Sequence, residues 1–191
     1  NYSIGYVGTA REAAEDAELH GSVSLPDLDT LSPTYKLFPV TNAAAFRTDA
    51  AFASGEGVRS IPLASAVYSP HTRPQAHGFD KGREWRWAPI INSYTADGKW
   101  CGAPAVMTVY STGGFAGSAW ASFGVNDPKW YSRPEVLRVI GDVARRIKSG
   151  VFIMDGGADF YTYTKGQEIR LGLSAANIGK SVRSGLTARV T

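Results

Sequence analysis

The feature that most constrains this 191-residue chain is an amphipathic segment from about Ser132 to Ser149. Ser132 and Glu135 match a capping box, and Pro134 suits a first helical turn. Cations fill the last turn, where the helix dipole favours them, and Gly150 follows as a stop signal. The apolar residues recur at helical spacing: Val136, Leu137, Ile140, Val143, Ala144 and Ile147. The pattern predicts a long helix that buries this face against another layer.

Strand-like segments surround the predicted helix. Residues 85–94, 103–111 and 117–125 read as strands, and Asp97-Gly98 and Gly113-Gly114 separate them as turns, which predicts an antiparallel meander. Further strands are expected at residues 2–7, 35–40, 58–63, 151–154, 160–163 and 168–177, and short helices at 10–19 and 42–51. The order predicts an α+β or mixed α/β fold, with a mixed sheet, flanking helices and the attached meander.

Length and composition narrow the remaining possibilities. We expect a mixed α/β domain over residues 1–165, and C-terminal strands over 166–191 that begin a following β-sandwich. A last strand is expected at 186–191, and both ends are interpreted as cuts from a longer protein. A net charge of +3 with interspersed acids argues against a nucleic-acid partner. No apolar run is long enough to span a membrane, and the single Cys101, interpreted as a buried structural thiol, excludes an internal disulfide.

The segment His71 to Trp87 (HTRPQAHGFDKGREWRW) is the densest aromatic and basic stretch. If Trp85 begins a strand, Trp85 and Trp87 share one face while Glu84 and Arg86 share the other. Flat aromatic faces stack on sugar rings, and neighbouring Arg and Asp groups bond hydroxyls in pairs. The predicted ligand-binding residues are Trp85, Trp87, Arg83, Arg86 and Asp80. In the alternative interpretation, the tryptophans are core residues and the charges pair within a structured loop.

A second candidate for chemistry is the segment Asp155-Gly156-Gly157-Ala158-Asp159. Two carboxylates on a glycine turn could hold a cation or act as acid and base; the alternative is a structural turn or bulge. With Glu84 and His77, they are the candidate catalytic groups of a hydrolase, either a glycosidase or an esterase. The spacing of the histidines and Asp80 fits no zinc pattern, so neither metal nor cofactor is expected. Motifs for acyl transfer, zinc proteolysis and dinucleotide binding are absent.

Two stretches carry a family resemblance. The first lies between Gly150 and Lys180, and the second, Arg83 to Val125, precedes it; together they cover about half of the chain. The matching positions of the first are Gly150, Gly157, Ala158, Phe160, Tyr163, Gly166, Leu171, Asn177, Gly179 and Lys180. Gln167 replaces the usual acid, and Glu168 is displaced by one position. These stretches resemble the region before immunoglobulin-like modules in large multidomain bacterial glycoside-hydrolase-like proteins.

The resemblance implies a non-catalytic accessory module of a bacterial carbohydrate-active protein. Such a module packs on a catalytic domain or contacts glycan, so its expected partners are other domains of the parent chain and polysaccharide. The resemblance also favours a periplasmic or secreted location and an immunoglobulin-like continuation after the C-terminal strands. Two alternatives stay open: a hydrolase domain using the Asp, Glu and His residues above, and a purely structural interdomain scaffold.

Overall fold

The computed structural model describes residues 2–6, 35–52, 57–72, 85–158, 160 and 162–188. The helix expected at residues 10–19 lies outside these ranges. So do five of the predicted site residues: His77, Asp80, Arg83, Glu84 and Asp159.

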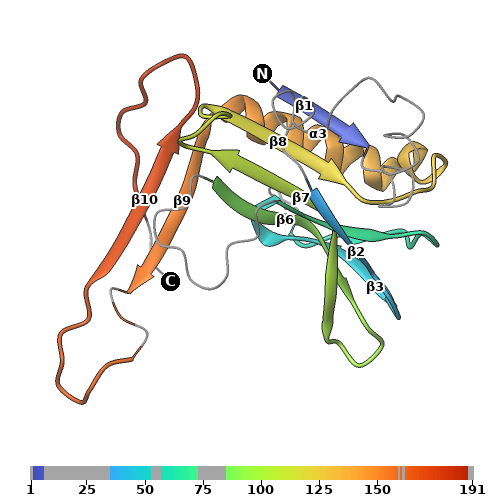
Figure 1. The fold of residues 1–191 in the computed structure, drawn as a ribbon, viewed down its shortest axis with the longest axis horizontal. Coiled ribbons are helices and arrows are strands. Elements are labelled where there is room, and N and C mark those ends of the chain that lie inside the picture. The colour runs from blue at the N-terminus through green and yellow to red at the C-terminus, as the bar shows by residue number, and fades with distance from the viewer. Residues whose placement is uncertain are drawn as a thin grey trace.

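A six-stranded mixed sheet forms the centre of the molecule, in the order β1-β8-β7-β6-β3-β4 (Figure 1). Its strands are β1 (Tyr2–Tyr6), β3 (Ala45–Thr48), β4 (Ser60–Ile61), β6 (Trp85–Tyr94), β7 (Trp100–Tyr110) and β8 (Ser118–Phe123). Strands β6, β7 and β8 form the predicted antiparallel meander, and β6 has the predicted ends. Strand β1 runs parallel to β8, which makes the sheet mixed, as expected.

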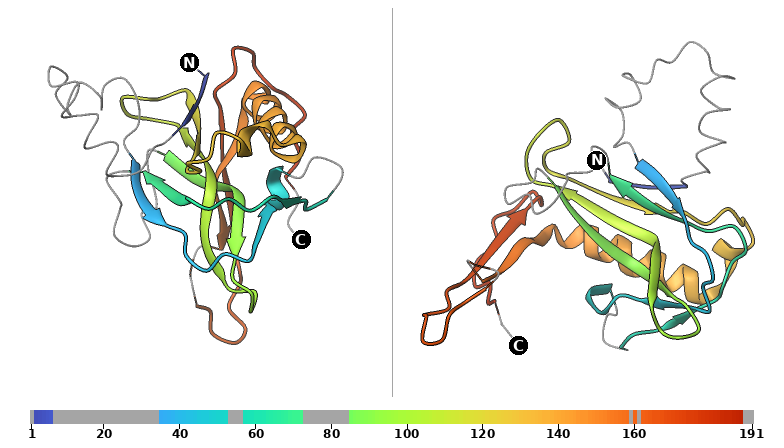
Figure 2. Two further views of the ribbon diagram at one scale, coloured as in Figure 1. Left: turned by 90° about the vertical axis from the view of Figure 1, so that its right-hand side faces the viewer. Right: turned by 60° about the horizontal axis from the view of Figure 1, so that its bottom comes forward.

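The helix α3 (Pro134–Ser149) covers one face of this sheet (Figure 2). Val136, Val139, Val143 and Ile147 are buried in a single core. Their partners from the sheet include Ala105, Met107, Val109, Ala121 and Phe123. The predicted apolar face is wrong at Ala144, which is exposed, and at Leu137, which is 54% exposed. The buried stripe passes through Val139 instead, which is 1% exposed.

The two ends of α3 differ in how well the sequence predicted them. The N-cap is Arg133, without a side-chain cap, so the predicted capping box is wrong. Ser132 belongs to a preceding 3-10 turn (Trp130–Ser132), and its hydroxyl donates to the Lys129 carbonyl instead. Gly150 ends the helix as predicted, with φ at 73° in the left-handed region that favours glycine.

Strands β2 (Tyr35–Pro39) and β5 (Tyr68–Thr72) pair as a separate two-stranded antiparallel sheet that lies against the central sheet. The Tyr68 amide donates to the Gly124 carbonyl at 2.6 Å, and the Ala103 amide donates to Ser69 Oγ at 3.0 Å. A Cβ at position 124 would lie 2.1 Å from the Tyr68 carbonyl oxygen, so only glycine allows this approach.

The helix expected at residues 42–51 is wrong. Residues 45–48 form β3, and only a 3-10 turn (Ala50–Phe52) follows. Phe46 pairs with Ile61 on one side and Ser93 on the other, so strand pairing and burial outweigh local helix preference. The strand expected at 58–63 shortens to the two residues of β4.

The last strands, β9 (Val151–Ala158) and β10 (Leu171–Asn177), form a separate two-stranded ribbon that projects from the sheet (Figure 1). The strand predicted at 151–154 continues through Asp155 and both following glycines, so a turn there is wrong. The register shifts between Ser174 and Ala175, opposite the Ile153–Asp155 stretch, in agreement with the bulge alternative. Residues 160, 162, 163 and 186–188 are not in strands, which corrects two further predictions.

Candidate functional site

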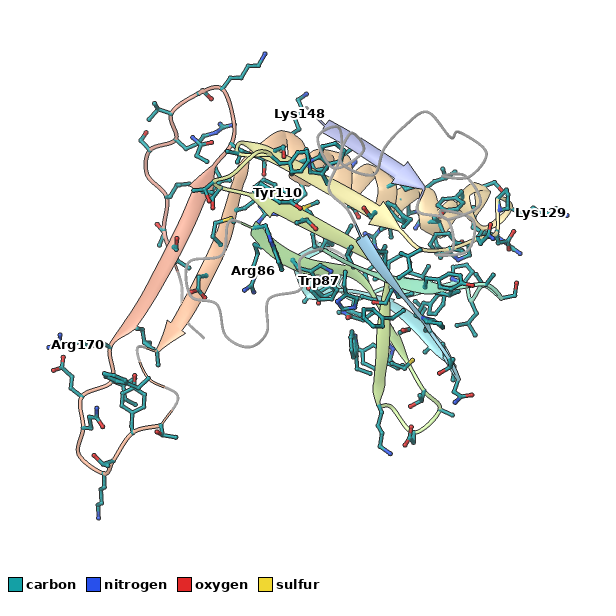
Figure 3. The ribbon with its side chains drawn as sticks, viewed as in Figure 1. Arg86, Trp87, Tyr110, Lys129, Lys148 and Arg170 are labelled. Carbon is teal, nitrogen blue, oxygen red and sulfur yellow. The ribbon has the colours of Figure 1, made fainter. Side chains whose placement is uncertain are left out.

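The predicted aromatic pair lies at the start of β6. Trp85 and Trp87 share one face of the sheet, and Arg86 lies exposed on the other, as expected from a strand that begins at Trp85. Figure 3 shows Arg86 and Trp87 on β6 and Tyr110 on the neighbouring β7. The register places Tyr110 opposite Trp85 and aligns Thr108 between Trp87 and Trp120. The pair therefore belongs to a larger group of aromatic residues in two neighbouring cross-strand rows.

Trp87 packs the two-stranded β2–β5 sheet onto the central sheet. Its Nε1 donates to the Pro70 carbonyl at 2.9 Å. Its ring stacks on His71, with 4.9 Å between centroids and 14° between planes. The His71 ring also meets the edge of Phe38 at 5.0 Å, and its Nε2 lies 3.1 Å from Ser69 Oγ. Burial lowers the pKa of His71 below its ordinary value. Trp87 is half-buried, which agrees better with the core alternative than with an exposed sugar-binding surface.

The candidate catalytic residues are not brought together in the described part of the chain. Asp155 is exposed on β9, and its Oδ1 accepts the Gly156 amide at 2.9 Å. Among the described residues, this carboxylate has no histidine or second carboxylate as a hydrogen-bond partner. Nor do these residues contain a group of three His, Cys, Asp or Glu side chains able to hold a metal ion. A hydrolase site at Asp155 would need partners from outside the described ranges.

A second aromatic cluster, which the sequence interpretation missed, lies at the far end of the β6–β7 hairpin. Trp100, the first residue of β7, is 51% exposed. The register aligns Ala45, Tyr94 and Trp100 across three strands and places Arg47 opposite Asn92. Paired residues point to the same side of a sheet, so these side chains share one face. Phe46 and Thr48 alternate with them and are buried on the opposite face.

A chain of hydrogen bonds fixes the orientation of Trp100. Its Nε1 donates to Asn92 Oδ1 at 2.9 Å, and Asn92 Nδ2 donates to Asp49 Oδ2 at 3.1 Å. The other carboxylate oxygen of Asp49 accepts the Ala51 amide at 3.0 Å. Asn92 is only 8% exposed, so the support is buried while the indole remains accessible. The polar edge of the indole is satisfied internally, and half of the residue's surface stays free for a ligand.

Tyr94 and Arg47 complete the cluster. The guanidinium carbon of Arg47 lies 5.6 Å from the centroid of the Tyr94 ring, within the range of a cation–π contact. We call the five residues Arg47, Asp49, Asn92, Tyr94 and Trp100 the hairpin surface. The tip of this hairpin extends away from α3 (Figure 1).

Hydrogen bonds and one ion pair close the turn that connects Tyr94 to Trp100. The Thr95 amide donates to the Lys99 carbonyl at 2.8 Å, and Gly98 adopts a φ of 81°. Lys99 Nζ lies 2.7 Å from Asp97 Oδ2, and the Thr95 hydroxyl donates to the same carboxylate. Its interaction with Lys99, and to a smaller extent its hydrogen bond with Thr95, lower the pKa of the Asp97 carboxyl below its ordinary value. The turn was predicted from Asp97-Gly98, and it was the one sequence signal that could have paired Tyr94 with Trp100.

The remaining sequence prediction near this surface concerns Cys101. It is half-buried, and its Sγ lies 3.5 Å from Ser93 Oγ.

In the described ranges, no helix has the length and apolar character needed to cross a bilayer.

The chain matches no known protein family, no curated protein and no solved structure. The geometry of the molecule itself is therefore the basis for a functional proposal.

Proposed function

We propose that this chain is a non-catalytic accessory module of a bacterial carbohydrate-active protein and that it contacts glycan through the hairpin surface. The observation that carries the proposal is Trp100: an indole that is 51% exposed and oriented by a buried amide. A ring held in place in the free protein loses little conformational freedom when a ligand stacks on it, which favours binding.

The groups around Trp100 suit the two chemical sides of a pyranose. The apolar C–H face of a sugar ring stacks on an aromatic plane, and its hydroxyls need donors and acceptors near the ring edge. Trp100 and Tyr94 supply aromatic surface, Arg47 supplies donors, and Asp49 has lone pairs left after its two internal hydrogen bonds. The hairpin surface thus offers aromatic rings for stacking and polar groups beside them on the same face of the sheet.

This assignment moves the proposed contact away from the residues favoured by sequence. Trp85 and Trp87 face one side of β6 and Arg86 the other, so the three cannot act as one site on the sheet surface. One face of Trp87 is covered by His71, and its Nε1 is bonded to the Pro70 carbonyl.

The test is isothermal titration of the chain against a panel of soluble plant, algal and host polysaccharides. We expect saturable binding to at least one, weakened at least tenfold in Trp100→Ala. Phe160→Ala is the matched control because Phe160 is also a large aromatic residue, 61% exposed, but lies after β9. Absence of heat across the panel, or equal binding by Trp100→Ala, would overturn the proposal.

A second candidate, interdomain packing, is favoured by the β9–β10 ribbon. The register puts Leu171, Leu173 and Ile153 on one face of the ribbon, and each is more than half exposed. Such a contiguous apolar surface is typical of a contact face. It supports a scaffold role against another domain of the parent chain, and it suits the expected immunoglobulin-like continuation.

The scaffold role predicts that this apolar face contributes nothing to the fold of the chain itself. Leu171→Ser with Leu173→Ser should leave the urea midpoint within error and should lower the binding of the dye anilinonaphthalene sulfonate. Unfolding of the double variant would contradict the scaffold role, because the leucines would then be required internally.

A further inference from the structure

We infer that the hairpin surface selects an anionic glycan, one whose carboxylate or sulfate group binds Arg47. The inference rests on the proposed glycan contact and adds the chemical class of the ligand.

Two carboxylates of the described residues flank this aromatic row in sequence, Asp49 and Asp97, and each already accepts protein donors. Asp49 accepts one hydrogen bond from the Ala51 amide and one from Asn92. Asp97 is bonded by Lys99 and by the Thr95 hydroxyl, so the charge of Lys99 is balanced within the turn.

Arg47 differs from these groups. It is exposed, and its described contact is the Tyr94 ring. Within the described part of the chain, the Arg47 guanidinium has no hydrogen bond and no carboxylate within ion-pair distance. The charged side chain of the hairpin surface that makes no hydrogen bond within these ranges is therefore a cation, and a ligand with a negative charge would use it. A guanidinium offers parallel N–H pairs that match the two oxygens of a carboxylate or sulfate.

The order of residues along the face brings Arg47 next to the aromatic rings. Tyr94 and Trp100 form one cross-strand row, and Arg47 and Asn92 form the adjacent row. Asp49 follows two residues beyond Arg47 and bonds Asn92 from that side. Because the Arg47 guanidinium lies over the Tyr94 ring, an anionic substituent on a sugar stacked on this aromatic row would lie beside Arg47, while the Asp49 carboxylate is bonded to Asn92.

The experiment compares three polysaccharides of similar length by titration calorimetry: a polyuronate, a sulfated galactan and a neutral galactan. We expect at least one anionic polymer to bind at least tenfold more tightly than the neutral one. Arg47→Gln should remove this preference, and Arg47→Lys should restore part of it. The preferred anion identifies the source of the charge, carboxylate or sulfate.

Lys99→Gln is the matched control, since it removes an equal charge from the turn of the β6–β7 hairpin, whereas Arg47 lies on the neighbouring strand β3. An equal loss in Lys99→Gln and Arg47→Gln would overturn the inference, because the attraction would then follow net charge alone. Equal binding of neutral and anionic polymers that depends on Trp100 but not on Arg47 would also overturn it, while the proposed glycan contact stands. Failure of all three polymers to bind, together with a silent wider panel, would overturn both.

Discussion

Asp142 offers the sharpest test of how the helix is held on the sheet. Its side chain is 4% exposed and lies between two guanidinium groups, with Arg59 bonded to one carboxylate oxygen and Arg145 to the other. Arg59 precedes β4, and its amide donates to Thr48 Oγ1 at 2.8 Å. The carboxylate thus links α3 to the β3–β4 edge of the sheet. We expect Asp142→Asn to destabilise the fold substantially.

The size of the effect follows from the burial of the two partners. Arg59 has a side-chain exposure of 17% and Arg145 one of 71%. Breaking a buried pair leaves an uncompensated charge and costs roughly 3–5 kcal/mol, whereas an exposed pair contributes about 0.2–1 kcal/mol. We therefore expect a loss of about 3 kcal/mol for Asp142→Asn and for Arg59→Gln, and less than about 1 kcal/mol for Arg145→Gln. In a chain of this length, a loss of about 3 kcal/mol lowers Tm by roughly 6–12 °C.

The assay is urea denaturation followed by tryptophan fluorescence, which Trp130 reports well because it is 2% exposed and packs in the core. Asp155→Asn is the control, since it removes an exposed carboxylate and should stay within about 0.5 kcal/mol of the parent. Equal costs for Arg59→Gln and Arg145→Gln would refute the burial argument. So would a stability change below about 0.5 kcal/mol for Asp142→Asn.

Three further predictions concern single positions. Thr108→Val should raise the unfolding free energy by about 1 kcal/mol, as measured by urea denaturation. The reason is that the fully buried Thr108 hydroxyl has no hydrogen-bond partner among the described residues. A loss of stability in this variant would show that the hydroxyl has a partner. Burial lowers the pKa of His71 in the folded chain below the ordinary value of 6.5. On acidification the unfolded chain therefore takes up the proton first, and the free energy of unfolding should fall as the pH drops from about 6.5 to the folded-state pKa. His71→Gln should flatten that part of the stability–pH profile, and an unchanged slope would rule out His71 as its source. Gly150→Ala should cost at least about 1–2 kcal/mol in a thermal melt because φ is 73° and the new Cβ would lie 2.8 Å from the Gly179 backbone; a smaller loss would mean that this crossing relaxes easily.

The sequence predicted those parts of the fold that local patterns determine. The 16-residue helix and the three-strand meander follow from residue spacing and turn residues, which act within a few positions. The predictions failed where a distant partner decides the conformation. Residues 45–48 form a strand because Phe46 pairs between Ile61 and Ser93. The segment around Asp155 stays extended because β10 pairs with it.

The hairpin surface could not be predicted for the same physical reason. Tyr94 and Trp100 flank a recognisable turn, but Arg47 and Asp49 come from a stretch with a helical signal. Only strand pairing brings Arg47 opposite Asn92, and only the fold shows that Asn92 bonds both Trp100 and Asp49. In contrast, the density of aromatic and basic residues around Trp87 indicated a site at a place where packing uses much of the aromatic surface.

The glycine and asparagine pattern behind the family resemblance has a structural explanation of its own. A Cβ on Gly150 would lie 2.8 Å from the Gly179 backbone, and the Ile178 amide donates to the Gly150 carbonyl at 2.7 Å. Asn177 Oδ1 accepts the Gly179 amide at 3.0 Å, and its Nδ2 donates to the Ser181 carbonyl at 2.9 Å. These residues therefore build a close crossing between the end of α3 and the segment after β10. A pattern that encodes such a crossing constrains the backbone and says nothing about a ligand, so the glycan proposal depends on Trp100 and its neighbours.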